Sequence, residues 1–241
     1  MRRRFIADTW TATTASLTGD QAHHLAHVLR AQPGQVYDIV ANGFLHRAEI
    51  VSVSDKEVAF TLHEELAAAS ALPLHLLLAV FKFDHMEWAI EKATELGVAR
   101  ITPILARRTE KHLAQAAAKR VERWRRIALE ASKQSRRTDL PIISDPIALK
   151  AALAQETASI RILLSETEQE QPLLKALTTR TLTSEDESFA LAIGPEGGWA
   201  PEEMALFTEH QWQHVTLGPR ILRAETAAIA AIAIVNAHLS Y

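Results

Sequence analysis

Two loops near the C-terminal end of the sequence combine charged residues with glycines at close spacing. The first, residues 194–198, reads Gly-Pro-Glu-Gly-Gly and directly follows the apolar run 189–193. The second, residues 218–226, places Ile221 and Leu222 between charged residues. Glycine lets a backbone approach a ligand closely, and proline stiffens a loop in advance. Either loop alone is equally compatible with a tight turn, but together they predict a site that holds an apolar ring beside charged groups.

The elements that must position these loops are strands of a parallel sheet. From residue 74 onward, apolar runs alternate with helical stretches, which is typical of a mainly parallel sheet covered by helices on both faces. The predicted strands are residues 74–80, 101–105, 160–164, 189–193 and 215–217. An alanine-rich helix is expected after the second loop. We therefore predict an α/β domain.

Two other helices of this domain are expected from their patterns. Asp84, with Glu87 three residues later, has the spacing of a capping box and predicts a helix start, and Gly97 predicts its end. The next helix is expected over residues 115–136. Its predicted apolar face is Val121, Trp124, Ala128 and Ala131, and its predicted basic face is Lys119, Arg123, Arg126, Lys133 and Arg137.

The basic face has two readings. It can be an ordinary solvated helix surface, as most charge runs are. However, few acids accompany these cations within the helix, so their mutual repulsion would be relieved by phosphate groups. The net charge of −3 hides this uneven distribution, and a polarised chain can still present a basic surface to nucleic acid.

The N-terminal part predicts a small β-rich module of barrel type. Short alternating runs fill residues 36–62, and Asn42-Gly43 between two of them is a strong hairpin signal. Residues 21–30 predict a short helix that ends before Pro33-Gly34. Residues 64–73 are expected to link the two parts.

Composition excludes several classes of site. The 241 residues include no cysteine, which excludes disulfides and zinc–thiolate sites. His23 and His27 share a helix face, but no third ligand is evident, so we expect no metal site. Glycine signatures of dinucleotide and P-loop sites are missing. No apolar run approaches the length of a membrane span or follows the N-terminus as a signal sequence, so a cytoplasmic protein is expected.

The two loops, read with an ordered series of other motifs, closely resemble the 16S ribosomal RNA uracil-N3 methyltransferase family, a branch of the SPOUT (α/β-knot) methyltransferases. Residues 194–199 read Gly-Pro-Glu-Gly-Gly-Trp, and residues 217–227 read Leu-Gly-Pro-Arg-Ile-Leu-Arg-Ala-Glu-Thr-Ala. Further matches lie in residues 3–5, 24–30, 86–98, 103–108 and 124–141, so the similarity runs nearly end to end.

The resemblance implies a PUA-like RNA-binding β-barrel over residues 1–68 and a SPOUT domain over residues 73–241. In this family the C-terminal segment threads into a trefoil knot, a rare exception to the rule against threading. The resemblance also implies a homodimer that binds S-adenosylmethionine and methylates N3 of a specific uridine in the 16S rRNA of the small ribosomal subunit.

The resemblance also implies roles for individual residues. The cofactor-binding residues are expected to be Leu164, Gly194, Glu196, Gly197, Gly198, Leu217, Gly218, Ile221 and Leu222. From the resemblance and the basic helix face together, the RNA-binding residues are expected to be Arg3, Arg4, Arg30, Lys82, Arg107, Arg108, Arg123, Arg126, Lys133 and Arg137. Arg223 is expected to stabilise negative charge on the uracil oxygens, and Glu225 to accept the N3 proton. Glu225 can instead serve only to favour the helix dipole.

Departures from the family pattern leave alternatives open. Phe83 and Thr109 stand where family members commonly have glycine and serine, which puts the shape of the RNA entrance in doubt. The alternatives are a SPOUT methyltransferase with another RNA target and a non-catalytic RNA-binding factor of ribosome assembly. A small-molecule methyltransferase is disfavoured, because it would have no use for the basic helix.

Overall fold

The computed structural model describes residues 4–67, 71–179 and 187–239, and the chain forms two compact units. The first unit comprises residues 1–70 and 132–140, and the second comprises residues 71–131 and 141–241. Residues 132–140 were not assigned to the N-terminal part from the sequence. Arg3, a predicted RNA contact, lies outside the described residues.

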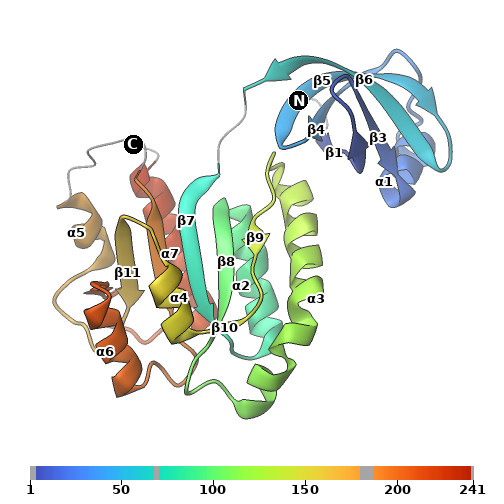
Figure 1. Ribbon diagram of the computed structural model, residues 1–241. Coiled ribbons are helices and arrows are strands. Elements are labelled where there is room, and N and C mark those ends of the chain that lie inside the picture. Colours follow the sequence, from blue (N-terminus) through green and yellow to red (C-terminus); the bar gives the residue numbers. More distant parts are fainter. Residues whose placement is uncertain (1–3, 68–70, 180–186, 240–241) are drawn as a thin grey trace. The chain divides into compact units, whose positions relative to one another are not determined.

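The first unit is a curled six-stranded sheet with one helical segment (Figure 1). Its strands are β1 (Arg4–Ile6), β2 (Thr9–Trp10), β3 (Thr14–Thr18), β4 (Val36–Ala41), β5 (Phe44–Val53) and β6 (Glu57–Leu66), in the spatial order β1-β4-β5-β6-β3-β2. β1 and β4 are parallel, and the other neighbours are antiparallel. The predicted short helix is α1 (Gly19–His23), which continues as a π-helical turn, η1 (His24–Val28).

The hairpin predicted at Asn42-Gly43 is confirmed. Both residues have left-handed backbone, with φ of 52° and 81°, as a two-residue type I′ turn requires. β4 and β5 pair right up to this turn, with Ala41 opposite Phe44. The turn therefore fixes the register that puts Ile39 and Ile50 into the core of the unit.

The predicted linker over residues 64–73 is wrong in extent. β6 continues to Leu66 and β7 begins at Leu72, so five of the seven described residues in that stretch are strand. Pro73 lies inside β7, where the pairing with β8 is irregular between Leu72 and His75. A proline cannot donate to the ladder, so this irregularity accommodates it.

The second unit is built on a seven-stranded sheet whose pairings are all parallel among the described residues. Its strands are β7 (Leu72–Ala79), β8 (Val98–Leu105), β9 (Ile142–Ile143), β10 (Ile147–Ala148), β11 (Ile160–Leu164), β12 (Phe189–Ile193) and β13 (Gln213–Val215). Their spatial order is β10-β8-β7-β12-β11-β13, and β9 also pairs with β8. The predicted parallel sheet is confirmed.

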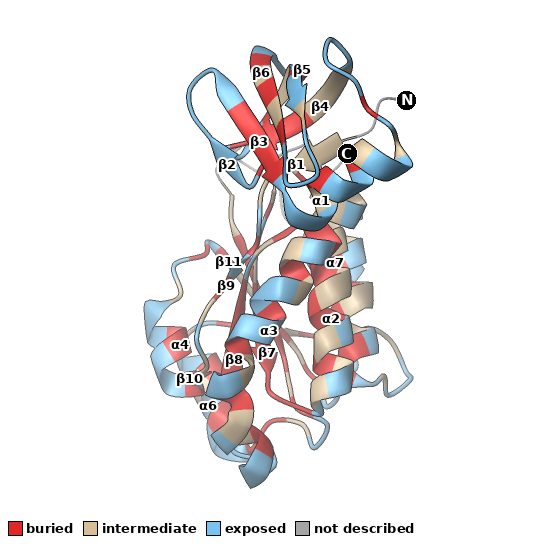
Figure 2. Cartoon of the chain, turned by 90° about the vertical axis from the view of Figure 1, so that its right-hand side faces the viewer, coloured by how far each residue is buried: buried red, intermediate tan, exposed pale blue. Residues whose placement is uncertain are grey.

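Helices cover both faces of this sheet, as predicted (Figure 1). They are α2 (Phe83–Glu95), α3 (Lys111–Ser135), α4 (Leu149–Gln155), α5 (Leu173–Thr178), α6 (Pro201–Glu209) and α7 (Ala224–Leu239). Residues of α2, α3, α5 and α7 share one core with one face of the sheet, and residues of α4 and α6 share a second core with the other. β12 is buried along its whole length because its residues alternate between these cores, and Figure 2 shows buried residues running along the strands and inner helix faces.

The predicted N-cap of α2 is wrong. The helix begins at Phe83, its N-cap is Lys82, and the side chain of that cap makes no hydrogen bond. The ring of Phe83 packs edge to face against Trp124 of α3, with 6.1 Å between the ring centroids. This packing favours a helix that begins at Phe83 and not after Asp84. Glu87, predicted to close a capping box, instead accepts two hydrogen bonds from Arg123 of α3.

α7 is an apolar core helix, with Ala228, Ala231, Ile232 and Val235 fully buried. It packs against α2 and α5. Among the described residues, no helix combines the length and apolarity needed to cross a membrane.

Candidate active site

The two predicted loops leave the sheet at the same edge. In the strand order β12-β11-β13, the first loop follows β12, the second follows β13, and Leu164 ends the strand between them. Because parallel strands place their carboxyl ends at one edge, the three segments meet there, which is where open α/β sheets bind ligands. Leu164 and Leu217 are half-buried and pack against the core beneath.

Side chains at two of the three glycines of the first loop would crowd neighbouring groups. A Cβ on Gly194 would lie 3.0 Å from Nε1 of the buried Trp199 indole. Gly198 has a φ of +69°, and a Cβ there would lie 2.8 Å from Oε1 of Glu166. The N–H of Gly198 donates to the carbonyl of Pro195 at 2.8 Å, which closes the turn. The backbone of this loop is therefore bare and held in a defined conformation.

The loop between β8 and α3, residues 106–110, supports the first loop, residues 194–198, which we call the glycine loop. Nη1 of Arg108 donates to the carbonyl of Gly197 at 2.8 Å. The backbone N–H of Arg107 donates to Oε1 of Glu203 at 2.8 Å, while Oε2 of the same carboxylate accepts from the N–H of Ala200 at 2.9 Å. Glu203 is buried. Through these two hydrogen bonds its carboxylate caps the start of α6 and ties that start to the loop between β8 and α3. The backbone of Arg107 and the side chain of Arg108 thus help to hold the glycine loop in place.

The second loop is anchored where it begins and open where it ends. Thr216 donates its N–H to the carbonyl of Gln171 at 2.9 Å, and its hydroxyl accepts from the N–H of Gly218 at 3.1 Å. Gly218 has a φ of +114°, which only glycine adopts readily. Ile221 exposes 86% of its surface and Leu222 is half-buried, so both apolar side chains are accessible to a ligand.

A cluster of charged and titratable groups joins three segments that are far apart in the sequence. Nδ1 of His85, in the first turn of α2, lies 3.5 Å from Oε1 of Glu225, in the first turn of α7. The same nitrogen lies 4.0 Å from Oε1 of Glu196 in the glycine loop, and Nζ of Lys82 lies 3.8 Å from that oxygen. The predicted residues Glu196, Glu225 and Lys82 are therefore brought together.

His85 was missed as a site residue. It follows β7, and β7 pairs with β12, so the start of α2 lies at the edge from which the glycine loop leaves. The available signal was a histidine in the first turn of the helix after a buried strand. That signal becomes informative only when the order of the strands is known.

Arg223, the predicted catalytic arginine, is exposed and immediately precedes α7. Glu225, the other predicted catalytic residue, is buried, with only 3% of its side chain exposed. One is thus accessible to a large substrate, and the other is confined to contacts inside the site.

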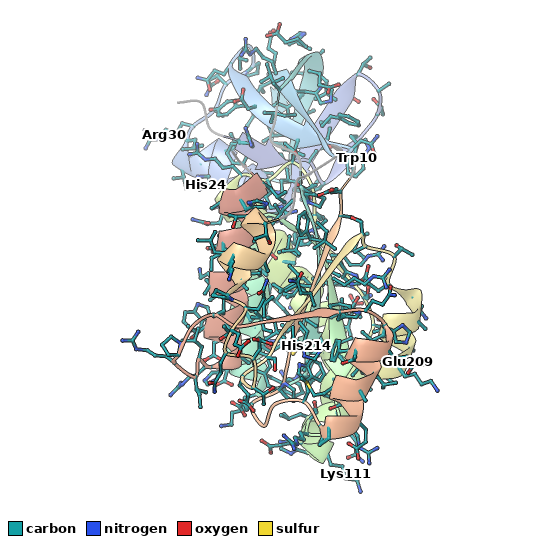
Figure 3. All side chains as sticks on the ribbon, turned by 90° about the vertical axis from the view of Figure 1, so that its left-hand side faces the viewer. Trp10, His24, Arg30, Lys111, Glu209 and His214 are labelled. Carbon is teal, nitrogen blue, oxygen red and sulfur yellow. The ribbon has the colours of Figure 1, made fainter. Side chains whose placement is uncertain are left out.

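The predicted RNA-binding residues fall into different environments. In the first unit, Arg4 donates to the carbonyl of Arg136, the buried Arg137 pairs with Asp139, and Lys133 is half-buried. Arg30 is exposed, with a left-handed φ of 50°, and Figure 3 shows its side chain directed outward.

In the second unit, Arg126 is exposed on α3, whereas Arg123 forms a bidentate ion pair with Glu87, with contacts of 2.5 and 2.7 Å. The sequence predicted few acidic partners for this face within its own helix, and Arg123 takes its partner from α2 instead. Among the described residues, no group of histidine and acidic side chains has the arrangement of a metal site.

Comparison with known proteins shows similarity over nearly the whole chain. Residues 68–236 match the family model described as an RNA methyltransferase domain, and residues 17–62 match that of an RNA methyltransferase PUA domain. Ribosomal RNA small subunit methyltransferase E of Bacillus subtilis is 32% identical over 231 residues, covering 93% of this chain and 90% of that protein. Its namesake from Synechocystis is 34% identical over 233 residues, with 94% and 74% covered.

Solved structures show the same similarity in three dimensions. A ribosomal RNA small subunit methyltransferase E from Neisseria gonorrhoeae, bound to S-adenosyl methionine, matches with a TM-score of 0.80 at 28% identity, over 97% of this chain and 96% of that one. A methyltransferase from Legionella pneumophila, in complex with the same cofactor, matches with a TM-score of 0.80 at 28% identity over 98% of both chains.

Proposed function

We propose, from the premise that this chain belongs to the RNA methyltransferase family whose model it matches, that it methylates N3 of a specific uridine in 16S rRNA. The protein is a methyltransferase of small-subunit ribosomal RNA, and S-adenosylmethionine is its methyl donor. The observation that carries the finer assignment is the meeting of the two loops, Arg223 and Glu225 at one edge of the parallel sheet.

The residues at this edge fit the cofactor. The glycines of the first loop carry no side chains, so the backbone from Gly194 to Gly198 can approach a polar ligand closely. The exposed Ile221 and half-buried Leu222 offer apolar surface for an adenine ring. We assign the cofactor to these residues together with Leu164, Glu196, Gly197, Leu217 and Gly218.

When bound, S-adenosylmethionine supplies an electrophilic methyl group. The protein must then orient the uracil and provide for the N3 proton, which has to leave as the new bond forms. Arg223, exposed next to α7, is assigned to the negative charge that develops on the uracil oxygens. Glu225 is assigned to the group of residues that accepts the N3 proton.

The same premise extends to the architecture and the partners. We assign residues 1–68 to a PUA-like RNA-binding domain and residues 73–241 to a SPOUT domain with a trefoil knot, acting as a homodimer in the cytoplasm. The matches of residues 17–62 and 68–236 to the two family models support the domain assignments. Among the predicted RNA contacts, the exposed Arg30 and Arg126 are best placed to meet phosphate groups.

The experiment that tests the proposed function measures transfer of labelled methyl groups from S-adenosylmethionine to small ribosomal subunits and, in parallel, to protein-free 16S rRNA. Transfer to either substrate supports the proposal, and the ratio of the two rates shows which form is recognised. Cofactor binding without transfer to either would favour another RNA target. Calorimetry that detects no cofactor binding would favour the non-catalytic assembly factor.

A further inference from the structure

His85 and Glu225 form a close pair inside the site, with 3.5 Å between Nδ1 and Oε1. Glu225 is held in the first turn of α7, where the helix dipole favours a negative charge, and only 3% of its side chain is exposed. Nδ1 of His85 is also buried, and among the described residues it makes no hydrogen bond, although Oε1 of Glu225 lies 3.5 Å away. Buried polar atoms without partners are rare and call for a functional reason.

The arrangement distinguishes the two nitrogens of the His85 ring. Nδ1 faces the carboxylates of Glu225, at 3.5 Å, and Glu196, at 4.0 Å, whereas the carboxylate near Nε2, that of Asp84 at 3.8 Å, is largely exposed to water, so the arrangement favours the hydrogen of a neutral ring on Nδ1. Nε2 then carries the free electron pair. Nδ1 is buried, whereas 29% of the His85 side chain as a whole is exposed.

The other charged groups around His85 are less suited to accept a proton from a large substrate. Glu225 is almost fully enclosed, and Glu196 is shared with Lys82 at 3.8 Å. Asp84, 3.8 Å from Nε2 on the same helix, has 78% of its side chain exposed to water. Imidazole is also the side chain that most often transfers protons in enzyme active sites.

We propose that His85 accepts the N3 proton of the uridine and that Glu225 is a positioning residue that holds Nδ1 and thereby directs Nε2 toward the substrate. This inference rests on the proposed function. In the step, the N3–H bond breaks and its proton passes to Nε2. The N3 electron pair forms the bond to the methyl carbon, while the carbon–sulfur bond breaks and its electron pair neutralises the sulfonium. Glu225 stabilises the imidazolium that results, as the orienting carboxylate of a catalytic triad does.

The test uses the full-length protein with His85→Asn, Glu225→Gln, the double variant and His210→Asn as a matched control. An asparagine amide nitrogen stands near the position of Nδ1, so His85→Asn keeps a donor toward Glu225 and removes Nε2. His210 is the C-cap of α6 and takes no part in the cluster. Single-turnover methyl transfer at saturating cofactor is measured across pH, together with cofactor affinity by calorimetry and the tautomer of His85 by imidazole-nitrogen NMR.

We expect His85→Asn to slow transfer near neutral pH by about 100-fold or more, the range of general-base catalysis, while cofactor affinity stays within a few fold of wild type. The wild-type rate should fall on acidification, and this fall should be absent in His85→Asn. The variant should recover at alkaline pH, where the N3 proton dissociates without help. Glu225→Gln should lower the rate less, abolish the preference for the Nδ1–H tautomer, and cause no further loss in the double variant.

A His85→Asn rate that follows wild type across the pH range would overturn the inference, as would additive losses in the double variant. Failure of the proposed function has a different result, because wild-type protein with normal cofactor affinity would then form no 3-methyluridine. If His85→Asn does not fold, the NMR tautomer of wild type against Glu225→Gln still decides whether Glu225 positions the ring.

Discussion

Replacement of Gly198 by alanine is the most direct test of how the glycine loop is built. Gly198 has a φ of +69°, which L-residues adopt at a cost of about 1–2 kcal/mol. The new Cβ would also lie 2.8 Å from Oε1 of Glu166, which must move away. Because this oxygen is the end of a flexible side chain, its displacement adds little, so the backbone conformation dominates the expected cost.

Gly197→Ala is the matched control in the same loop. Gly197 is not among the residues with positive φ, and its Cβ would make ordinary contacts of 3.5 and 3.6 Å with the Arg108 side chain. A glycine replaced at a compatible position stabilises a protein by about 0.4–1 kcal/mol, because the unfolded chain loses conformational freedom. Gly197→Ala is therefore expected to be neutral or slightly stabilising.

The assay is thermal unfolding by calorimetry, with cofactor affinity measured on the same samples. For a chain of this size, the loss of about 1–2 kcal/mol in Gly198→Ala lowers Tm by about 2–8 °C. Cofactor affinity should also fall, because the carbonyl and N–H groups of the loop are displaced. Equal Tm values for the two alanine variants would refute the reasoning, since they would show that the left-handed conformation at Gly198 is not required.

Three further predictions concern charged residues. Burial disfavours the charged form of Glu156, but hydrogen bonds from His75 and from the N–H of Ala158 outweigh the effect of burial and hold the pKa of this carboxyl below its ordinary 4.5. The ionised carboxylate therefore stabilises the folded protein above pH 4.5, and this stability is lost as the pH falls through the pKa of the folded state. Glu156→Gln should cost about 2 kcal/mol near neutral pH, and denaturant unfolding should show this difference narrowing below pH 4.5; a constant difference would contradict it. Charge reversal at the exposed Arg126 should weaken rRNA binding and lower its salt dependence by about one counterion, more than reversal at Arg123, whose charge Glu87 already neutralises; equal effects in a salt titration would argue against this assignment. Arg223→Ala should reduce the single-turnover rate by about 100- to 1,000-fold with cofactor affinity within a few fold, and a normal rate would remove Arg223 from the chemistry.

The parts of the fold that local chemistry determines were predictable from the sequence. Asn42-Gly43 specifies its hairpin because these residues tolerate left-handed backbone, and the apolar run of β12 indicates a strand buried on both faces. β9 and β10 gave no signal, because two-residue strands are too short to show any periodicity. The glycines of the first loop were recognised from their close spacing, whereas the crowding of a Cβ by Trp199 at Gly194 and by Glu166 at Gly198 is visible only in the folded structure.

The parts that depend on distant contacts were not predictable. Asp84 has the spacing of an N-cap, but the packing of Phe83 against Trp124 starts α2 earlier. Arg123 looked unpaired because its partner, Glu87, lies on another helix. His85 joins the site only because β7 lies next to β12, and the periodicity of neither strand predicts which strand lies beside it.

The central claim is the identity of the reaction, and mass analysis of the product nucleoside tests it most directly. Small-subunit 16S rRNA methylated by this protein with labelled S-adenosylmethionine would be digested, and the labelled nucleoside mapped. We predict that all label appears as 3-methyluridine at one position of the rRNA. Label on another base, on another uridine atom or spread over many positions would contradict the assignment of this site to N3 methylation of a specific uridine.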